Sequence, residues 1–302
     1  MSDLIADIMK LKKERNAVIL AHLYQPGEIQ EIADFVGDSL DLSRKAANTN
    51  ADVIVFCGVH FMAETANILS PDKIVLLPAA DAGCRMAEMI SGAALAKKKA
   101  EMPNAVVVAY VNTTAEVKSL SDICCTSANA IKIVNSIPKD KDILFVPDKN
   151  LGAYVSEKTN RKMEFWPGFC PVHHGLFVEE VEDMREEHPN AKVLAHPECP
   201  ADVLAKADYI GSTTEIINYA KASAHDEFII ATECGVFHQL EKDNPKKKFY
   251  LASDSMVCPN MKKISLEKIK KSLETLEPRV IVPAEMREKA VGSLTKMLEV
   301  CR

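Results

Sequence analysis

The chain has 302 residues, of which 47% are hydrophobic and 26% are charged, a balance typical of a globular protein with a large core. Its formal net charge of -6 argues against a broad nucleic-acid-binding face, which needs a surplus of basic residues. No apolar run approaches the roughly 18 residues that span a bilayer. The charged, amphipathic residues 1–15 lack the apolar segment of a signal peptide. We therefore expect a cytoplasmic protein without nucleic-acid or membrane partners.

The predicted elements form one pattern that recurs three times along the chain. Each copy begins with a helix, predicted over residues 3–15, 91–102 and 178–188. An apolar strand follows and starts with Asn-Ala, at residues 16, 104 and 190. The next helix is expected to begin near residues 39, 127 and 213. Two further strands, separated by a helix, are predicted at residues 53–56, 143–146 and 228–231, and at 75–77, 163–165 and 249–251.

The three copies keep a common register. The first two are 88 residues apart (16 to 104) and the last two are 86 residues apart (104 to 190). An identical aspartate recurs in this register as Asp34, Asp122 and Asp208. Alternating strands and helices imply parallel sheets with right-handed crossovers. We therefore predict an α/β fold of three pseudo-threefold-related, three-layer α/β/α domains with small parallel sheets, and an active site at the central axis.

The repeat also sets the expected domain boundaries, at residues 1–87, 88–173 and 174–302. The tail from Arg279 begins like a fourth copy but lacks its polar residues. We expect this tail to add a completing strand and a helix to the third domain.

Polar residues occupy the predicted carboxyl ends of the first strand of each copy, where ligands bind in parallel α/β sheets. They are His22, Tyr24, Tyr110, Asn112, His196 and Glu198. Hydroxyl residues precede the next helices and are predicted as N-caps, namely Ser39, Ser127 and Thr213. Ser212 adds another hydroxyl beside them. Three helix N-termini converging on one axis would suit a small molecule with several anionic groups.

Three loop cysteines follow the last strand of each copy, at Cys84, Cys170 and Cys258. Three converging thiolates suit a [4Fe–4S] cluster with one open iron. Zinc is an equally good reading of the spacing, because His173 or His174 could complete a tetrahedral site. A surface or second-shell role is nevertheless the favoured prediction for these two histidines. The other cysteines considered are expected to lie in the core: Cys57, Cys124, Cys125 and Cys234.

Several motifs resemble the quinolinate synthase family over essentially the whole chain. They include Ala21-His22-Leu23-Tyr24-Gln25, Cys125-Thr126-Ser127-Ala128-Asn129, Pro147-Asp148-Lys149-Asn150, His196-Pro197-Glu198-Cys199 and Cys258-Pro259-Asn260-Met261-Lys262. The resemblance implies three α/β domains around a central [4Fe–4S] cluster that acts as a Lewis acid. It also implies condensation of iminoaspartate with dihydroxyacetone phosphate to quinolinate in NAD biosynthesis, with the enzyme that supplies iminoaspartate as a partner.

The resemblance assigns roles to the residues singled out above. Cys84, Cys170 and Cys258 would bind the cluster, and Tyr24 and Glu198 would be the acid/base groups. His22 and His196 would position carboxylates and assist proton movement. The phosphate and carboxylate oxygens would be held by Tyr110, Asn112, Ser39, Ser127, Ser212 and Thr213.

Two other functions remain open from the sequence. One is an iron–sulfur hydro-lyase that dehydrates a different hydroxy acid and needs no triose phosphate. The other is a zinc-stabilised, non-catalytic binding protein for phosphorylated metabolites, which would be colourless and free of acid-labile sulfide.

Overall fold

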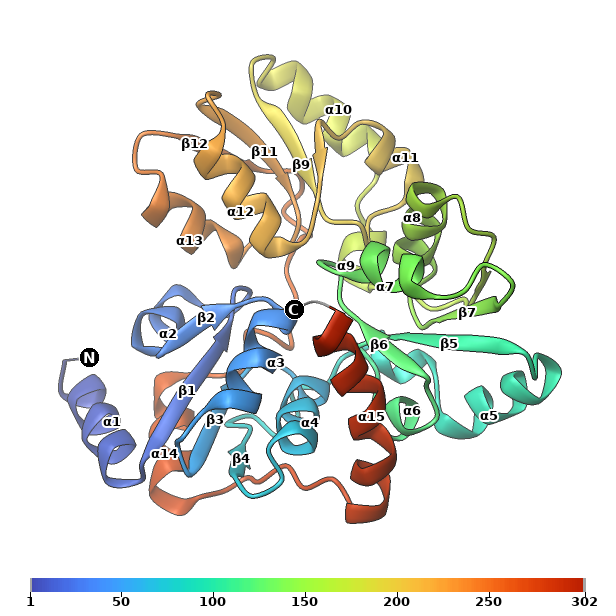
Figure 1. Cartoon of the computed structure of the whole chain (residues 1–302). Helices are drawn as coiled ribbons and strands as arrows, with labels where there is room; N and C mark the ends of the chain where they lie inside the picture. Colours follow the sequence, from blue (N-terminus) through green and yellow to red (C-terminus); the bar gives the residue numbers. More distant parts are fainter. Residues whose placement is uncertain (1, 301–302) are drawn as a thin grey trace.

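The computed structural model describes residues 2–300; Cys301, the C-terminal cysteine, lies outside them. The three predicted copies are three units arranged around the centre of the molecule, each with its own four-stranded parallel sheet (Figure 1). The predicted α/β fold with small parallel sheets is confirmed. Within the described residues, no helix is long and apolar enough to cross a membrane.

The first unit has the strand order β2-β1-β3-β4. Its elements are α1 (Ser2–Glu14), β1 (Ala17–His22), α2 (Gly27–Ile32), β2 (Phe35–Gly37), α3 (Ser39–Asn48), β3 (Val53–Cys57), α4 (His60–Leu69) and β4 (Ile74–Leu76).

The second unit repeats this order as β6-β5-β7-β8. It consists of a 3-10 turn, η1 (Ala87–Met89), followed by α5 (Gly92–Glu101), β5 (Ala105–Tyr110), α6 (Ala115–Ser119), β6 (Ile123–Cys125), α7 (Ala130–Ser136), β7 (Asp142–Val146), α8 (Lys149–Thr159) and β8 (Glu164–Phe165).

The third unit has the order β10-β9-β11-β12. Its elements are α9 (Pro171–His174), α10 (Val178–Glu187), β9 (Lys192–Ala195), α11 (Ala201–Ala205), β10 (Tyr209–Ile210), α12 (Thr213–Ala222), β11 (Glu227–Ala231), α13 (Val236–Asp243) and β12 (Lys248–Leu251). Two C-terminal helices follow, α14 (Leu266–Thr275) and α15 (Ala284–Val300).

One strand of each sheet was absent from the sequence prediction. The strands β2, β6 and β10 span only two or three residues, too few for an alternating or apolar pattern to be recognised. Each pairs with the edge of the first strand of its unit. They complete the four-stranded sheets.

The recurring aspartate has the same structural role in all three units. The carboxylates of Asp34, Asp122 and Asp208 accept the backbone N–H groups of Ile19, Val107 and Val193 at 2.8, 2.8 and 2.9 Å. Each aspartate lies directly before the short edge strand of its unit. The side chain therefore satisfies a strand N–H where the edge strand begins, which explains why this residue type recurs.

We expect Asp122→Ala to lower the free energy of unfolding by about 1–3 kcal/mol, because the N–H of fully buried Val107 loses its acceptor. Asp122→Asn keeps an acceptor oxygen and should lower the free energy of unfolding less than Asp122→Ala does. Urea unfolding of the two variants beside the wild type measures this difference. Equal stability of all three proteins would contradict the assigned role.

The C-terminal tail does not complete the third sheet. Residues 279–283 form no strand within the described chain, and Arg279 makes only an isolated antiparallel bridge with Leu76 of the first unit. Pro278 and Pro283 flank this stretch and lack the N–H groups that a strand ladder needs. The predicted completing strand is therefore wrong, while the predicted helix exists as α15.

The two last helices pack on the first two units. Helix α14 lies against α1, and α15 lies against α4 of the first unit and against α6 and β6 of the second (Figure 1). The apolar core is continuous across these two units and includes Leu294 and Met297 of α15. The third unit buries separate clusters, one containing Val193 and the other Leu194.

Candidate active site

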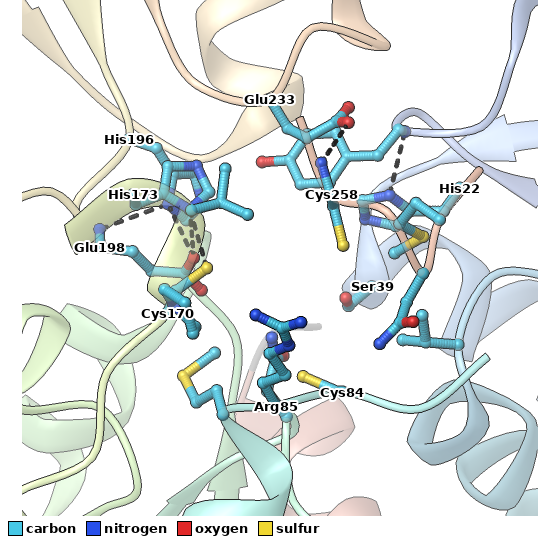
Figure 2. Close-up of a pocket in the computed structure, with 18 of the residues that line it drawn as sticks. His22, Ser39, Cys84, Arg85, Cys170, His173, His196, Glu198, Glu233 and Cys258 are labelled. Atoms are coloured by element: carbon cyan, nitrogen blue, oxygen red, sulfur yellow. Dashed lines mark hydrogen bonds and ion pairs between the residues drawn. The ribbon is translucent and has the colours of Figure 1, made fainter. Parts of the chain in front are cut away.

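A cavity of about 250 Å³ lies where the three units meet (Figure 2). It is bordered by the segments that follow the strands of all three sheets. With the exception of Ser212, the predicted site residues line this cavity: His22, Tyr24, Ser39, Cys84, Tyr110, Asn112, Ser127, Cys170, His196, Glu198, Thr213 and Cys258. The cavity lies beyond the carboxyl ends of the strands, where parallel α/β sheets place their ligands.

The helices beside the cavity are capped by residues other than those predicted. Helix α3 is capped by Asp38, whose carboxylate accepts two N–H groups of the first turn, and α12 is capped by Ser212. Ser39 and Thr213 are the first helical residues, so the predicted N-cap role is wrong for both. In each helix the side chain one residue earlier, Asp38 or Ser212, already accepts N–H groups of the first turn that have no partner within the helix. The Ser39 hydroxyl is thus left for the cavity, while the Thr213 hydroxyl donates to that of Tyr24 at 3.0 Å.

Ser127 also differs from its predicted role as a cap. Helix α7 begins at Ala130, with Asn129 at the N-cap position. The Ser127 hydroxyl instead lies 3.2 Å from Nε2 of His196. The structure therefore joins the second and third units through this pair at the cavity wall.

Two of the three described histidines that line the cavity, His22 and His196, are held by the same turn in the first and third units. Nδ1 of His22 accepts the N–H of Tyr24 at 3.1 Å, and Nδ1 of His196 accepts the N–H of Glu198 at 3.3 Å. An accepting Nδ1 places the proton of a neutral ring on Nε2. Burial lowers the pKa of each histidine to about 3. Both rings are therefore neutral at physiological pH and present an Nε2–H donor.

This pair predicts a pH dependence of stability. A histidine with a pKa of 6.5 unfolded and about 3 folded takes up its proton first in the unfolded state. Stability is therefore lost as the pH falls below 6.5, by about 2 kcal/mol per histidine between pH 7 and pH 5. We expect His22→Gln to remove about that much of the difference between urea unfolding at pH 7 and pH 5. The same change at exposed His225 should leave the difference unaltered.

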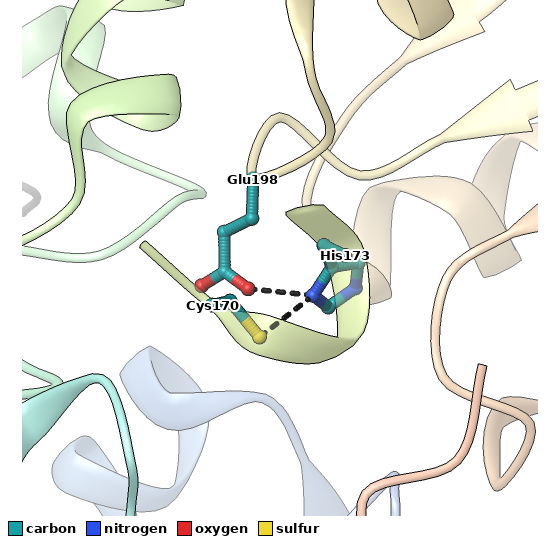
Figure 3. Close-up of side chains that lie close together, drawn as sticks. All are labelled: Cys170, His173 and Glu198. Atoms are coloured by element: carbon teal, nitrogen blue, oxygen red, sulfur yellow. Dashed lines mark hydrogen bonds and ion pairs between the residues drawn. The ribbon is translucent and has the colours of Figure 1, made fainter. Parts of the chain in front are cut away.

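Glu198 is a buried carboxylate at the cavity with partners from two units. It accepts the hydroxyl of Tyr110 at 2.6 Å and lies 2.7 Å from Nδ1 of His173 (Figure 3). Burial alone would raise the pKa of this carboxyl, but its interactions with His196 and His173 and the hydrogen bonds from His173 and Tyr110 lower it to about 2. Burial and the charge of Glu198 raise the pKa of Tyr110. The pair is an ionised carboxylate accepting from a neutral phenol.

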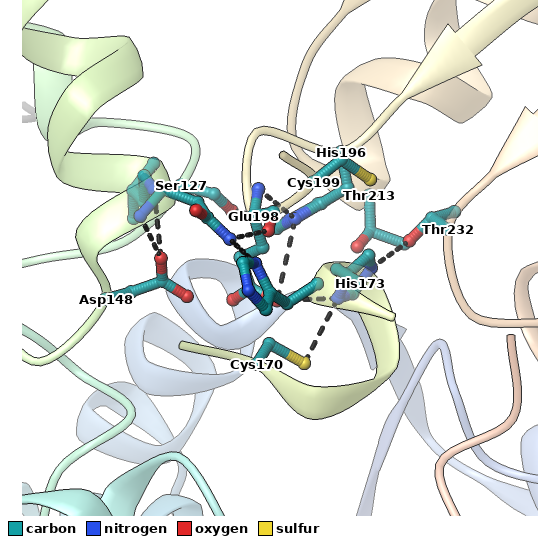
Figure 4. Close-up of polar contacts among 12 residues, drawn as sticks. Ser127, Asp148, Cys170, His173, His196, Glu198, Cys199, Thr213 and Thr232 are labelled. Atoms are coloured by element: carbon teal, nitrogen blue, oxygen red, sulfur yellow. Dashed lines mark hydrogen bonds and ion pairs between the residues drawn. The ribbon is translucent and has the colours of Figure 1, made fainter. Parts of the chain in front are cut away.

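A chain of hydrogen bonds joins Glu198 to Tyr24 across the cavity wall. Figure 4 shows its part from Glu198 through His173 to Thr232. Nε2 of His173 lies 2.9 Å from Oγ1 of Thr232, and this oxygen lies 2.8 Å from the hydroxyl of Tyr24. Thr213 donates to the same phenol oxygen at 3.0 Å. Burial, followed by the charge of Glu198, raises the pKa of Tyr24. Tyr24 is therefore a neutral phenol with a continuous route for a proton to a buried carboxylate.

Two members of this chain were not predicted from the sequence. His173 is only 1% exposed, so the surface alternative is wrong for it, but its Nδ1 lies 3.2 Å from Sγ of Cys170, in keeping with the other predicted alternative, a place beside the cysteine. His174 is half-buried and lies 3.0 Å from the Asn150 amide. Thr232 and the buried Glu233 directly follow β11. The rule that ligand-binding residues follow strand ends was applied only to the first strand of each copy. Applied to β11, it would have indicated both residues.

The three loop cysteines all face the cavity, one from each unit (Figure 2). Burial raises the pKa of Cys84 to about 12, and burial also raises the pKa values of Cys170 and Cys258. Backbone N–H groups oppose this shift at each sulfur. They come from Met86 and Ala87, from His173, and from Asn260 and Met261. Each donor lies two or three residues after its cysteine, so the units hold their thiols in similar turns.

This donor set fits a resident metal or iron–sulfur cofactor. Thiols are soft ligands, and N–H groups aimed at their sulfurs stabilise thiolates and tune iron–sulfur centres. A second combination, Cys170 with His173 and Glu198, places three possible ligand atoms within 4.8 Å of one another. In that group Nδ1 of His173 also lies 3.2 Å from Sγ of Cys170.

A buried ion pair supports the loop of Cys258. Glu233 accepts the N–H of Cys258 at 3.0 Å and that of Gly235 at 2.7 Å, and it pairs with Nζ of Lys262 at 2.9 Å. Lys262 also donates to the backbone oxygen of Tyr24. Glu233 thereby ties this cysteine to the segment that carries Tyr24.

Comparison with known proteins matches residues 6–299 to the family model described as quinolinate synthetase A protein. The chain belongs to this family. It is 54% identical over 296 residues to quinolinate synthase of Desulforudis audaxviator, with 98% of each chain covered. It is 54% identical over 299 residues to that of Methanosarcina barkeri, with 99% and 98% covered. For Dehalococcoides mccartyi strain 195 the identity is 55% over 293 residues, with 97% of each chain covered.

Family membership agrees with the resemblance seen in the sequence and makes this chain an enzyme of the quinolinate synthase type. The relatives match nearly from end to end, so the similarity covers all three units. The cysteines and the family together fit a metal or iron–sulfur cofactor at the central cavity.

Proposed function

We propose that this enzyme condenses iminoaspartate with dihydroxyacetone phosphate to give quinolinate, phosphate and two waters. The observation that carries the proposal is the convergence, in one cavity, of three thiols from three units with an ionised carboxylate and a neutral phenol. Both substrates are small anions, in keeping with a cavity of about 250 Å³. The name quinolinate synthase, shared by the relatives, supports the product.

Cys84, Cys170 and Cys258 would hold a [4Fe–4S] cluster. Three protein thiolates leave one of its irons without a protein ligand, and such an iron supplies Lewis acidity toward a substrate oxygen. Thiolates also bind zinc, and it is the similarity to quinolinate synthases that supports a cluster over zinc. The thiolate set also suits a reducing compartment such as the cytoplasm.

Proton movement falls to Glu198 and Tyr24. Glu198 is ionised and acts as the base toward carbon-bound or nitrogen-bound hydrogens. Tyr24 holds its proton and donates it to a departing oxygen. Thr232 and His173 then pass a proton between the two groups, because the bonds from Tyr24 to His173 are 2.8 and 2.9 Å and His173 lies 2.7 Å from Glu198.

The remaining predicted residues would orient the substrates. Nε2–H groups of neutral His22 and His196 suit carboxylate oxygens. The buried side-chain oxygen of Asn112 has no hydrogen-bond partner within the described chain, which leaves it for a substrate N–H or O–H donor. Ser39, Ser127, Tyr110 and Thr213 would bind other oxygens. Ser212 caps α12 and would act by holding Thr213 in place.

The test is anaerobic purification, analysis of iron and acid-labile sulfide, and an assay for quinolinate. Iminoaspartate is formed in the assay from oxaloacetate and ammonia, replacing the partner enzyme that would supply it. We expect a brown protein whose quinolinate production requires the triose phosphate. A colourless, sulfide-free protein with full activity would contradict the cluster. Dehydration of another hydroxy acid without triose phosphate would contradict the reaction.

A further inference from the structure

One cationic side chain at the cavity has no hydrogen-bond or ion-pair partner within the described residues. Arg85 follows Cys84, and its guanidinium group projects into the cavity (Figure 2). Among the described cavity-lining residues it is the only arginine or lysine. Within residues 2–300 its side chain makes no hydrogen bond, ion pair or ring contact. An arginine that is aimed into a cavity without a carboxylate partner is available to an anionic ligand.

The surrounding charges leave the role of anion binding to this residue. Lys262 approaches from the third unit, but it is paired with Glu233 at 2.9 Å. His22 and His196, two of the three described histidines that line the cavity, are neutral, because burial lowers the pKa of each to about 3. Glu198 is ionised, and thiolate ligands would add further negative charge. Among the described cavity-lining residues, Arg85 is therefore the one arginine or lysine that a doubly charged substrate group meets.

The position of Arg85 selects which anion it meets. Arg85 is exposed although it lines the cavity, so it lies where the cavity opens to solvent. His22, His196 and Glu198 are 3–4% exposed and form the inner wall. The carboxylates of the diacid stay in the product ring and must remain beside the proton-transfer groups. The phosphate leaves as a free ion, and a site at the opening provides its exit.

We propose that Arg85 binds the phosphate group of the triose phosphate at the solvent-facing end of the cavity. The planar guanidinium presents paired N–H donors that match two phosphate oxygens. Arg85 is thus a specificity residue that captures the phosphorylated substrate and retains the leaving group until its bond to carbon breaks. This assignment rests on the proposed reaction.

The kinetic test compares Arg85→Gln with Arg287→Gln, which makes the same charge change on α15, away from the cavity. We expect Arg85→Gln to raise KM for dihydroxyacetone phosphate about tenfold, because a charge-assisted hydrogen bond is lost at a partly hydrated site. KM for iminoaspartate, kcat and iron content should stay within about threefold. Arg85→Lys keeps the charge without the paired donors. Its KM for dihydroxyacetone phosphate should lie between those of the wild type and Arg85→Gln. A change confined to KM for iminoaspartate would overturn the proposal.

A binding measurement separates this proposal from the reaction itself. Isothermal titration of the anaerobically purified holoenzyme with inorganic phosphate needs no turnover, and succinate serves as the dicarboxylate probe. We expect Arg85→Gln to weaken phosphate binding about tenfold and to leave succinate binding unchanged. Equal phosphate affinity of Arg85→Gln and Arg287→Gln, or no phosphate binding by the wild type, would refute the role of Arg85. If phosphate binding depends on Arg85 but the wild type forms no quinolinate, the proposed reaction is refuted and the phosphate site is not.

Discussion

Alanine at Cys84, Cys170 or Cys258 is expected to abolish retention of iron and acid-labile sulfide and to reduce quinolinate formation to background. The three thiols line one cavity and come from equivalent turns of the three units. Loss of any one leaves two thiolates, too few to hold a cubane with a single open iron. Iron and sulfide analysis and the visible absorption spectrum of anaerobically purified protein measure the effect.

Two other cysteines provide matched controls for these substitutions. Cys57 is fully buried in the first sheet and Cys234 is half-buried beside Glu233; neither lines the cavity. Cys57→Ala and Cys234→Ala should keep the iron and sulfide content of the wild type. Full iron and sulfide in a variant lacking Cys84, Cys170 or Cys258 would show that this thiol does not bind the cofactor.

Loading should also depend on pH. Burial raises the pKa of Cys84 to about 12, and burial likewise raises that of Cys170, so both thiols are protonated before a metal binds. Cofactor binding must then release protons. In reconstitution with iron and sulfide, the yield of loaded protein should therefore rise as the pH increases from 6 to 8.

Glu198→Gln is expected to lower kcat by roughly 10²–10⁴-fold, the range for loss of a general acid or base. The change removes the buried negative charge that accepts from Tyr110 and faces His173. Glutamine keeps the size of the side chain but cannot accept a proton. The three proposed cluster ligands are all cysteines and remain in this variant. The iron and sulfide content should therefore stay unchanged. Steady-state kinetics with parallel iron analysis distinguishes loss of proton transfer from loss of the cofactor.

The matched control for this substitution is Glu288→Gln on α15, which makes the same chemical change at an exposed position. Its kcat should equal that of the wild type. Wild-type turnover in Glu198→Gln would refute the acid/base role. A parallel loss of iron would indicate instead that Glu198 acts through the cofactor site, for example through the contact of His173 with Cys170.

The repeat was readable from the sequence because its signals are local. The Asn-Ala starts, the apolar strands and the aspartates at 34, 122 and 208 each appear at fixed offsets in one chain. Each feature satisfies the hydrogen bonds or burial of its own unit, as the bonds from the aspartates to the first strands show. The same offsets aligned Cys84, Cys170 and Cys258. Choosing iron–sulfur over zinc required the family resemblance, because spacing alone does not specify a metal.

Errors of one or two residues arose where two polar side chains compete for one role. At α3 and α12 the caps are Asp38 and Ser212, each next to the predicted residue. Adjacent capping residues have similar preferences, and only the backbone conformation decides between them. The strands β2, β6 and β10 were missed for the related reason that two or three residues carry no periodic pattern.

The sequence by itself determined the three α/β units, the three aligned cysteines and the polar strand ends, because these depend on short-range pattern and equal spacing. Only the tertiary structure showed that α15 packs on both of the first two units, that His173 and Thr232 link Glu198 to Tyr24, and that Arg85 has no partner within residues 2–300. Such features depend on contacts between segments far apart in the chain. Thr232 lies 59 positions from His173, and a lone arginine becomes informative only when its surroundings are known.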